Sequence, residues 1–132
     1  MKNTVLDSYA ALAFLFQEKG HAKVLDLFEK AAEKDRALFI AAPNWAEVRY
    51  IVERKVGAAR WREVRQKLLG LPLEIISADQ TLAELAGQIK VTKKMSLADC
   101  FAAALAKQKK ADLYTGDPEF RAVERDIKVV WL

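Results

Sequence analysis

The sequence predicts an α/β fold, a three-layer α/β/α sandwich with a central parallel sheet between helices. Short apolar segments rich in β-branched residues alternate with longer segments whose apolar residues recur at helical spacing. The short segments lack the apolar-polar alternation of a half-exposed strand, which indicates strands buried on both faces, as in parallel sheets. The predicted strands are residues 3–6, 37–41, 73–76, 112–115 and 128–131.

Capping residues, prolines and glycines mark the predicted helices between these strands. Asp7 or Ser8 caps the first helix, which is apolar nearly all round and therefore needs cover on more than one side. Ser77 or Asp79 caps a later helix that carries an apolar stripe of Leu82, Leu85 and Ile89, assigned to the core rather than to a partner surface. The other predicted helices are residues 22–34, 43–56, 58–69 and 96–109, with the first over 9–17 and a short one after Pro118.

Size and composition predict one compact domain over residues 1–132, because 52% hydrophobic residues can bury a core without disulfides. The 22 basic and 18 acidic side chains give a net charge of +4, which suits weak attraction to a polyanion but identifies no partner. The single cysteine, Cys100, cannot form an internal disulfide, which indicates a reducing, cytoplasmic location. No segment is long enough to span a membrane.

Four acidic residues occupy the places where strands end or helices begin. Asp7 follows the first predicted strand and Asp117 the fourth, while Glu47 and Asp99 lie in the first turns of their helices. In open parallel sheets, ligand sites form beyond the carboxyl ends of the strands, so these side chains are expected to converge. Carboxylates about 4 Å apart repel by roughly 4 kcal/mol at an effective dielectric near 20. Such a cluster needs protons, basic partners or a divalent ion, and oxygen ligands suit Mg²⁺ or Mn²⁺.

Each of these acids also has a structural explanation, because a carboxylate at a helix start stabilises the helix by about 0.5 to 2 kcal/mol. Asp7 and Asp117 can be helix caps, and Ser96 with Asp99 fits a capping box. Function is favoured by the set as a whole and by Asp7, since an acid inside an apolar segment is costly to bury. Asn44 has two equal explanations, as a helix cap or as a residue that orients a carboxylate.

The remaining inventory excludes several kinds of site. His21 is the only histidine and is expected in an exposed loop, which rules out a paired-histidine nuclease or a histidine-rich zinc site. Neither a nucleophile elbow nor a glycine-rich phosphate loop is present. Most basic residues suit solvated helix faces, with Lys93 and Lys94 equally suited to a phosphate contact. The three tryptophans are assigned to the core or an interface rather than to base stacking.

Four motifs in this order resemble those of the PIN-domain ribonucleases, particularly the VapC-type toxins of bacterial and archaeal toxin-antitoxin pairs. The resemblance covers essentially the whole chain and implies the PIN-like form of the predicted sandwich. The motifs are Val5-Leu6-Asp7-Ser8, Asn44-Trp45-Ala46-Glu47-Val48, Ser96-Leu97-Ala98-Asp99-Cys100-Phe101 and Leu113-Tyr114-Thr115-Gly116-Asp117-Pro118-Glu119-Phe120.

The resemblance implies endonucleolytic cleavage of RNA by water that one or two Mg²⁺ or Mn²⁺ ions activate. Asp7, Glu47, Asp99 and Asp117 match the acidic positions of the family, with Asp7 and Asp99 expected closest to the ion. Thr115 matches the hydroxyl residue before the last acid, and Glu119 is a candidate outer carboxylate that matches less securely. The family also implies a homodimer and a VapB-like antitoxin that covers the site.

Three other hypotheses compete with this one. A haloacid dehalogenase-type phosphatase needs a second aspartate two residues after the first, where this chain has Tyr9. A phospho-accepting receiver domain needs an acid pair near the first strand and a late lysine, but Asp7 stands alone there. The remaining alternative is a catalytically silent PIN-like scaffold that binds RNA or a partner, and the complete set of acids argues against it.

Overall fold

A five-stranded, fully parallel sheet forms the centre of the computed structural model, which describes residues 1–132. Its strand order is β3-β2-β1-β4-β5. The strands are β1 (Thr4–Leu6), β2 (Leu38–Ala41), β3 (Leu73–Ile76), β4 (Asp112–Thr115) and β5 (Val129–Trp131). The predicted α/β class and parallel sheet are therefore confirmed.

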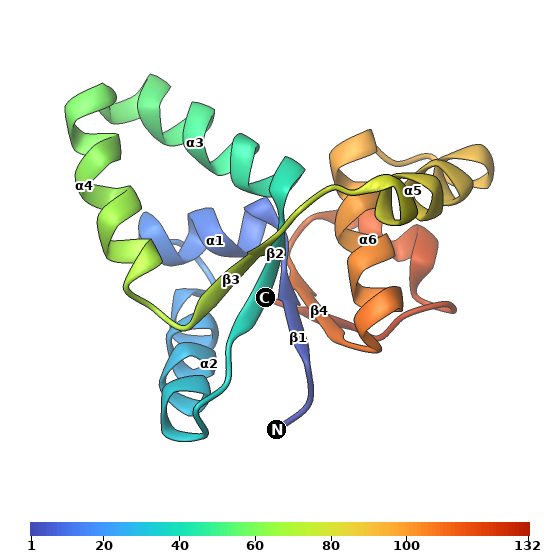
Figure 1. Cartoon of the computed structure of the whole chain (residues 1–132), viewed down its shortest axis with the longest axis horizontal. Coiled ribbons are helices and arrows are strands. Elements are labelled where there is room, and N and C mark those ends of the chain that lie inside the picture. Colours follow the sequence, from blue (N-terminus) through green and yellow to red (C-terminus); the bar gives the residue numbers. More distant parts are fainter.

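Helices cover both faces of this sheet (Figure 1). The first four pack on one face, where α3 and α4 form a pair that extends outward over α1. The last two cover the opposite face together with the 3₁₀ helix. The helices are α1 (Ser8–Leu15), α2 (His21–Glu33), α3 (Ala42–Val56), α4 (Ala58–Leu69), α5 (Gln80–Thr92), α6 (Leu97–Lys109) and the 3₁₀ helix η1 (Pro118–Val123).

Alternate residues of the central strands point into different helical layers. Val5 packs in a cluster with the apolar side chains of α5 and α6, whereas Leu6 packs with those of α1 and α2. The expectation that every strand is buried on both faces is wrong for the edges of the sheet. All three residues of β5 are only half-buried, and Glu74 in β3 is exposed, because an edge strand lacks a neighbour on one side.

Two local predictions in the first third of the chain are also corrected. The first helix ends at Leu15 rather than Gln17, because Gln17 adopts a left-handed conformation with φ of 53° and reverses the chain. His21 is half-buried and begins α2, whereas the sequence suggested an exposed loop. Gly20 makes this early start possible, since its φ of 94° is costly for any other residue.

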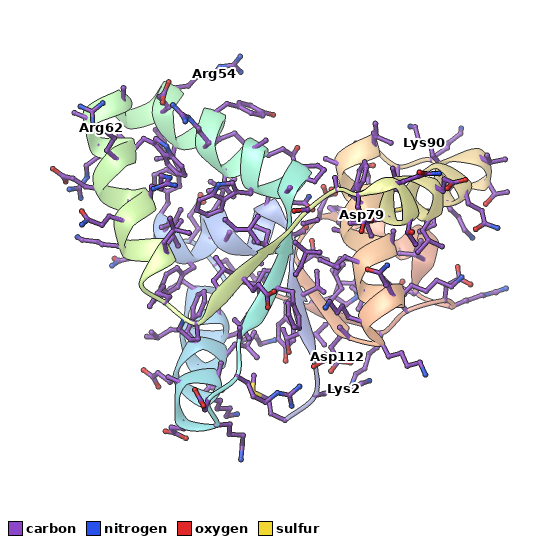
Figure 2. All side chains as sticks on the ribbon, in the orientation of Figure 1. Lys2, Arg54, Arg62, Asp79, Lys90 and Asp112 are labelled. Atoms are coloured by element: carbon purple, nitrogen blue, oxygen red, sulfur yellow. The ribbon has the colours of Figure 1, made fainter.

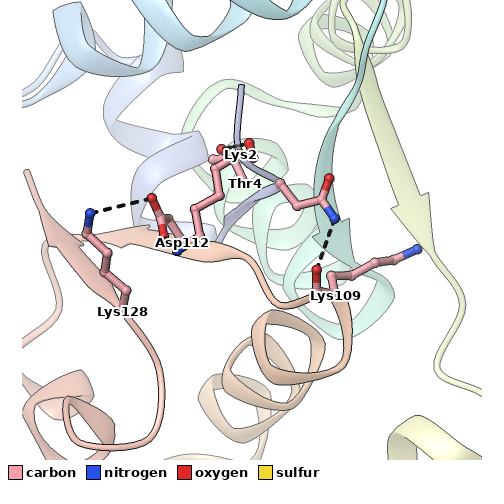
Figure 3. A network of polar contacts seen from close by, with 6 residues as sticks. Lys2, Thr4, Lys109, Asp112 and Lys128 are labelled. Carbon is pink, nitrogen blue, oxygen red and sulfur yellow. Dashed lines mark hydrogen bonds and ion pairs between the residues drawn. The ribbon is translucent and has the colours of Figure 1, made fainter.

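The amino ends of β1 and β4 carry a buried acid that has basic partners (Figure 3). The carboxylate of Asp112 forms ion pairs with Lys2 at 2.8 Å and with Lys128 at 3.9 Å. Beside it, the Asn3 amide donates a hydrogen bond to the Lys109 carbonyl at 2.9 Å, which ties the start of the chain to the end of α6. Each pair contributes little alone because both lysines are largely exposed, but together they neutralise the carboxylate.

Arg54 of α3 and Arg62 of α4 lie on the outer side of that helix pair and are directed away from the sheet (Figure 2). Arg54 lies over the ring of Tyr50 at 4.9 Å, so its nearest aromatic partner is on its own helix. This arrangement agrees with the interpretation of these residues as solvated helix faces.

No helix of the structure combines the length and the apolar composition that crossing a bilayer requires.

Two glycine substitutions are expected to change stability in opposite directions. A Cβ at Gly20 would lie 2.6 Å from the Cβ of Leu132 in a left-handed backbone, so Gly20→Ala should destabilise the fold by roughly 1–3 kcal/mol. Gly87 lies in α5 with nothing within 4 Å of an added Cβ, so Gly87→Ala should stabilise it by about 0.5–1 kcal/mol. Urea unfolding of both variants checks this, and similar effects of the two changes would contradict it.

Candidate active site

The candidate site lies at the carboxyl ends of β1 and β4. The chain proceeds from β1 to β2 and β3 on one side of the sheet, and then crosses to β4 on the other side. Such a reversal leaves a crevice between the two central strands, which is the usual ligand site of an open parallel sheet. Asp7 directly follows β1 and Thr115 ends β4, and these strands are in register at Leu6 and Tyr114.

Asp7 joins the two strands through its two carboxylate oxygens. One accepts a hydrogen bond from the Ala10 amide at 2.8 Å, so Asp7 is the helix cap of α1. The other accepts a hydrogen bond from the hydroxyl of Thr115 across the crevice. Thr115 in turn accepts a hydrogen bond from the Asp117 amide at 3.0 Å. Helix capping therefore accounts for only one of the two carboxylate oxygens of Asp7, a residue that is just 1% exposed.

Asp99 enters the site from the first turn of α6. Ser96 caps this helix, since its hydroxyl accepts a hydrogen bond from the Asp99 amide at 3.2 Å. A complete capping box would return the Asp99 carboxylate to the Ser96 amide. That amide instead donates to Glu119 at 2.7 Å, a residue of η1. The predicted capping box is therefore only half formed, and the Asp99 carboxylate is not used by it.

Asp99, Asp117 and Glu119 form the tightest group of acids. One carboxylate oxygen from each lies within 4.8 Å of the others. The Glu119 amide donates to the Asp117 carboxylate at 3.0 Å, which fixes the two neighbouring side chains. Asp7 lies outside this trio, and both of its carboxylate oxygens accept hydrogen bonds, from Ala10 and Thr115. The family resemblance made Glu119 only a candidate outer carboxylate, whereas the structure places it in this trio.

Glu47 approaches from α3 and is held by two neighbours. Its carboxylate accepts hydrogen bonds from the Ser8 hydroxyl at 2.9 Å and from the Asn44 amide at 3.4 Å. Asn44 also donates to the carbonyl of Ala98 at 3.2 Å, which connects α3 to the start of α6. Asn44 is the third residue of α3 and is fully buried, so it is no helix cap. Of its two proposed roles, the structure supports that of orienting a carboxylate.

Burial and mutual repulsion keep protons on two of these acids near neutral pH. Burial raises the pKa of Asp7 to about 7, although its hydrogen bonds from Thr115 and Ala10 act in the opposite direction. The pKa of Asp99 is raised to about 8, chiefly by burial and also by the charges of Asp117, Asp7 and Glu119. None of the five acids lies within 4.0 Å of a lysine or arginine nitrogen.

The donor set fits a hard divalent cation. It consists of carboxylate oxygens without basic partners, which is the ligand type that Mg²⁺ and Mn²⁺ prefer. Asp99, Asp117 and Glu119 each offer one carboxylate oxygen that could contact such an ion. Glu47 and, once it is ionised, Asp7 add negative charge, since the two carboxylates interact electrostatically. A cation would favour the ionised carboxylates and so lower the pKa values of Asp7 and Asp99, which burial and, to a lesser extent, neighbouring charges raise.

Other residues considered from the sequence lie apart from this cluster. Lys93 is paired with Asp126 at 3.8 Å, which favours its structural explanation over a phosphate contact. Trp61 is buried and its ring centroid lies 5.6 Å from that of Trp45, as expected for core residues. Leu82 is buried in the core, and Leu85 and Ile89 pack against the same cluster. Cys100 is buried as well.

Comparison with known families identifies the fold. The family model described as the PIN domain matches residues 4–126. The chain belongs to the PIN domain family. No curated protein matches the sequence. The PIN assignment agrees with the all-parallel sheet and with the acids at its carboxyl edge.

Several solved structures share this PIN fold at low sequence identity. The DNA-bound VapBC of Salmonella typhimurium has a TM-score of 0.78 and 17% identity, covering 99% of this chain and 98% of that one. A toxin-antitoxin complex from Klebsiella pneumoniae has a TM-score of 0.70 and 21% identity, with 97% and 96% coverage. VapC20 of Mycobacterium tuberculosis, a Sarcin-Ricin loop cleaving toxin, has a TM-score of 0.71 and 17% identity, with 92% and 95% coverage.

The metal-free protein should lose stability as the pH rises from 4 to 8. Unfolded Asp7 releases its proton near the ordinary pKa of 3.8, whereas the folded residue keeps it up to about pH 7, so rising pH favours unfolding. This separation corresponds to at most roughly 4 kcal/mol. Thermal unfolding should therefore show Asp7→Asn and Asp99→Asn to be more stable than the wild type at pH 8, with little difference at pH 4.

Mg²⁺ should stabilise the wild type more at pH 8 than at pH 4, because binding requires ionised carboxylates. Asp112→Asn is the matched control, since Asp112 is a buried acid that already has two basic partners. A stability difference between Asp7→Asn and the wild type that does not change with pH would contradict the account.

Proposed function

We propose that this PIN-domain protein is an endoribonuclease dependent on Mg²⁺ or Mn²⁺ and acts as a VapC-type toxin. The observation that carries the proposal is the cluster of acids without basic partners at the switch point of the sheet. The similarity to VapBC structures and to a Sarcin-Ricin loop cleaving toxin supports RNA as the substrate.

Each residue of the site has a distinct role in the proposed reaction. When bound, a divalent ion would lower the pKa of water and offset negative charge on the scissile phosphate. Asp99 and Asp117 would hold the ion from two different elements, with Glu119 fixing the start of α6 through the Ser96 amide. Thr115 keeps the Asp7 carboxylate in place, because its hydroxyl group donates a hydrogen bond to that carboxylate.

Glu47 completes the negative wall on the α3 side of the site. The Ser8 hydroxyl and the Asn44 amide both donate to it, so its carboxylate has a defined position. Asn44 also holds the first turn of α6 through Ala98, and the positions of Glu47 and Asp99 are thereby linked. The alternative function, a silent scaffold, has no use for carboxylates held together at this electrostatic cost.

We further propose a VapB-like antitoxin as partner and a homodimer as the assembled form of the toxin. Several of the similar structures are toxin-antitoxin complexes, which supports such a partner. Leu97, the first residue of α6, is 55% exposed two positions before Asp99. An antitoxin segment that covers the site would bury this apolar side chain.

The purified protein should cleave RNA in the presence of Mn²⁺ or Mg²⁺ and stop when EDTA is added. Asp99→Asn should lower the rate by more than about 100-fold while the protein remains folded, because a metal ligand is lost. Asp112→Asn should keep most of the activity, since Asp112 lies at the opposite edge of the sheet. Gel assays of RNA cleavage and circular dichroism measure both properties.

Cleavage that persists in EDTA, or that Asp99→Asn does not reduce, would contradict the proposed mechanism. RNA binding without any cleavage by the wild type would favour the silent scaffold. Mapping of new RNA 5′ ends after induced expression, with Asp7→Asn as the comparison, would identify the target.

A further inference from the structure

Tyr9 is an aromatic residue beside the acids that the core does not use. It is 43% exposed and belongs to none of the buried apolar clusters. Its ring lies directly on Gly116, where an added Cβ would be 2.2 Å from the ring edge. Gly116 separates Thr115 from Asp117, so the ring borders the candidate active site. The absence of a side chain at Gly116 thus allows an aromatic ring to lie next to the acids.

A hollow of about 290 Å³ adjoins the same ring. Leu12 and Ala13 of α1 give it an apolar wall, and Glu18 and Lys19 give it one acidic and one basic side chain. These two charges cancel, so the hollow offers no net attraction to a phosphate group. Its aromatic face, apolar wall, hydrogen-bond donor and hydrogen-bond acceptor instead match the faces and edges of a nucleobase.

We propose that Tyr9 and this hollow form a nucleobase-binding subsite for a nucleotide adjacent to the scissile phosphate. The inference rests on the proposed endoribonuclease function and adds a substrate-positioning residue to it. The phosphate lies at the acids, and the neighbouring base stacks on Tyr9 with its edge toward Glu18 and Lys19. Stacking tolerates different bases, so the subsite positions the RNA strand more than it selects a sequence.

The test compares cleavage of RNA by Tyr9 variants with matched controls. The substrate is a single-stranded RNA oligonucleotide that spans the strongest cut mapped for the wild type in mixed RNA, with Mn²⁺ present. Base stacking of about 1–3 kcal/mol corresponds to a 5- to 150-fold effect, so Tyr9→Leu should lower kcat/KM at least fivefold. Tyr9→Phe keeps the ring and should stay within about twofold of the wild type.

Tyr50→Leu is the matched control, because Tyr50 is 44% exposed but lies on α3 beside Arg54. This change should leave kcat/KM within about twofold of the wild type, since no nucleobase contacts that ring. Circular dichroism and thermal unfolding of all variants verify that each one is folded.

Abasic substrates separate base stacking from a structural role of Tyr9. Removing the base at one nucleotide next to the cut should slow the wild type to the rate of Tyr9→Leu and abolish the difference between them. The subsite would be overturned if Tyr9→Leu cleaves intact RNA at the wild-type rate. It would also be overturned if Tyr9→Leu remains slower than the wild type on every abasic substrate. Both results leave the nuclease assignment intact. Either result overturns the subsite, and weaker binding of a protein partner by Tyr9→Leu would not rescue it. A wild type that cuts no RNA would overturn both proposals.

Discussion

The gathering of acids at the carboxyl edge of the sheet, against the cost of burying carboxylates and their mutual repulsion, is the constraint on which this structure depends. Five acids, which follow β1 or belong to α3, α6 and the segment after β4, interact electrostatically, and none forms an ion pair with a basic side chain. At an effective dielectric near 20, each pair of unit charges at 4 Å costs about 4 kcal/mol. The fold must hold these groups together against that force, and it does so with hydrogen bonds that cross between elements.

Three of these hydrogen bonds explain how the site keeps its shape. The Thr115 hydroxyl joins β4 to Asp7, the Ser96 amide joins α6 to Glu119, and the Asn44 amide joins α3 to Ala98. Asp112 at the amino edge shows the opposite solution, since two lysines neutralise it. The structural acid Asp112 therefore has basic partners, whereas the acids of the candidate site have none.

The sequence predicted the sheet and the main acids because both depend on local patterns. Apolar segments before Asp7 and Thr115 identify two strands, and parallel strands place their carboxyl ends at one edge. The place of Glu119 could not be predicted, because its bond to Ser96 joins residues 23 positions apart. The hydrogen bond from Asn44 to Ala98 spans 54 positions. Because the sequence does not reveal such a distant contact, it could not decide whether Asn44 caps a helix or orients a carboxylate. The partial burial of the edge strands follows from the strand order, which no single segment of the sequence encodes.

The most direct measurement is a crystal structure of the protein with Mn²⁺, using the anomalous signal to locate the ion. We expect a peak bounded by carboxylate oxygens of Asp99 and Asp117, with Asp7 and Thr115 still joined by their hydrogen bond beside it. Absence of a peak there at saturating Mn²⁺, or a peak only at other acids such as Asp112, would contradict a metal site at the carboxyl edge of the sheet.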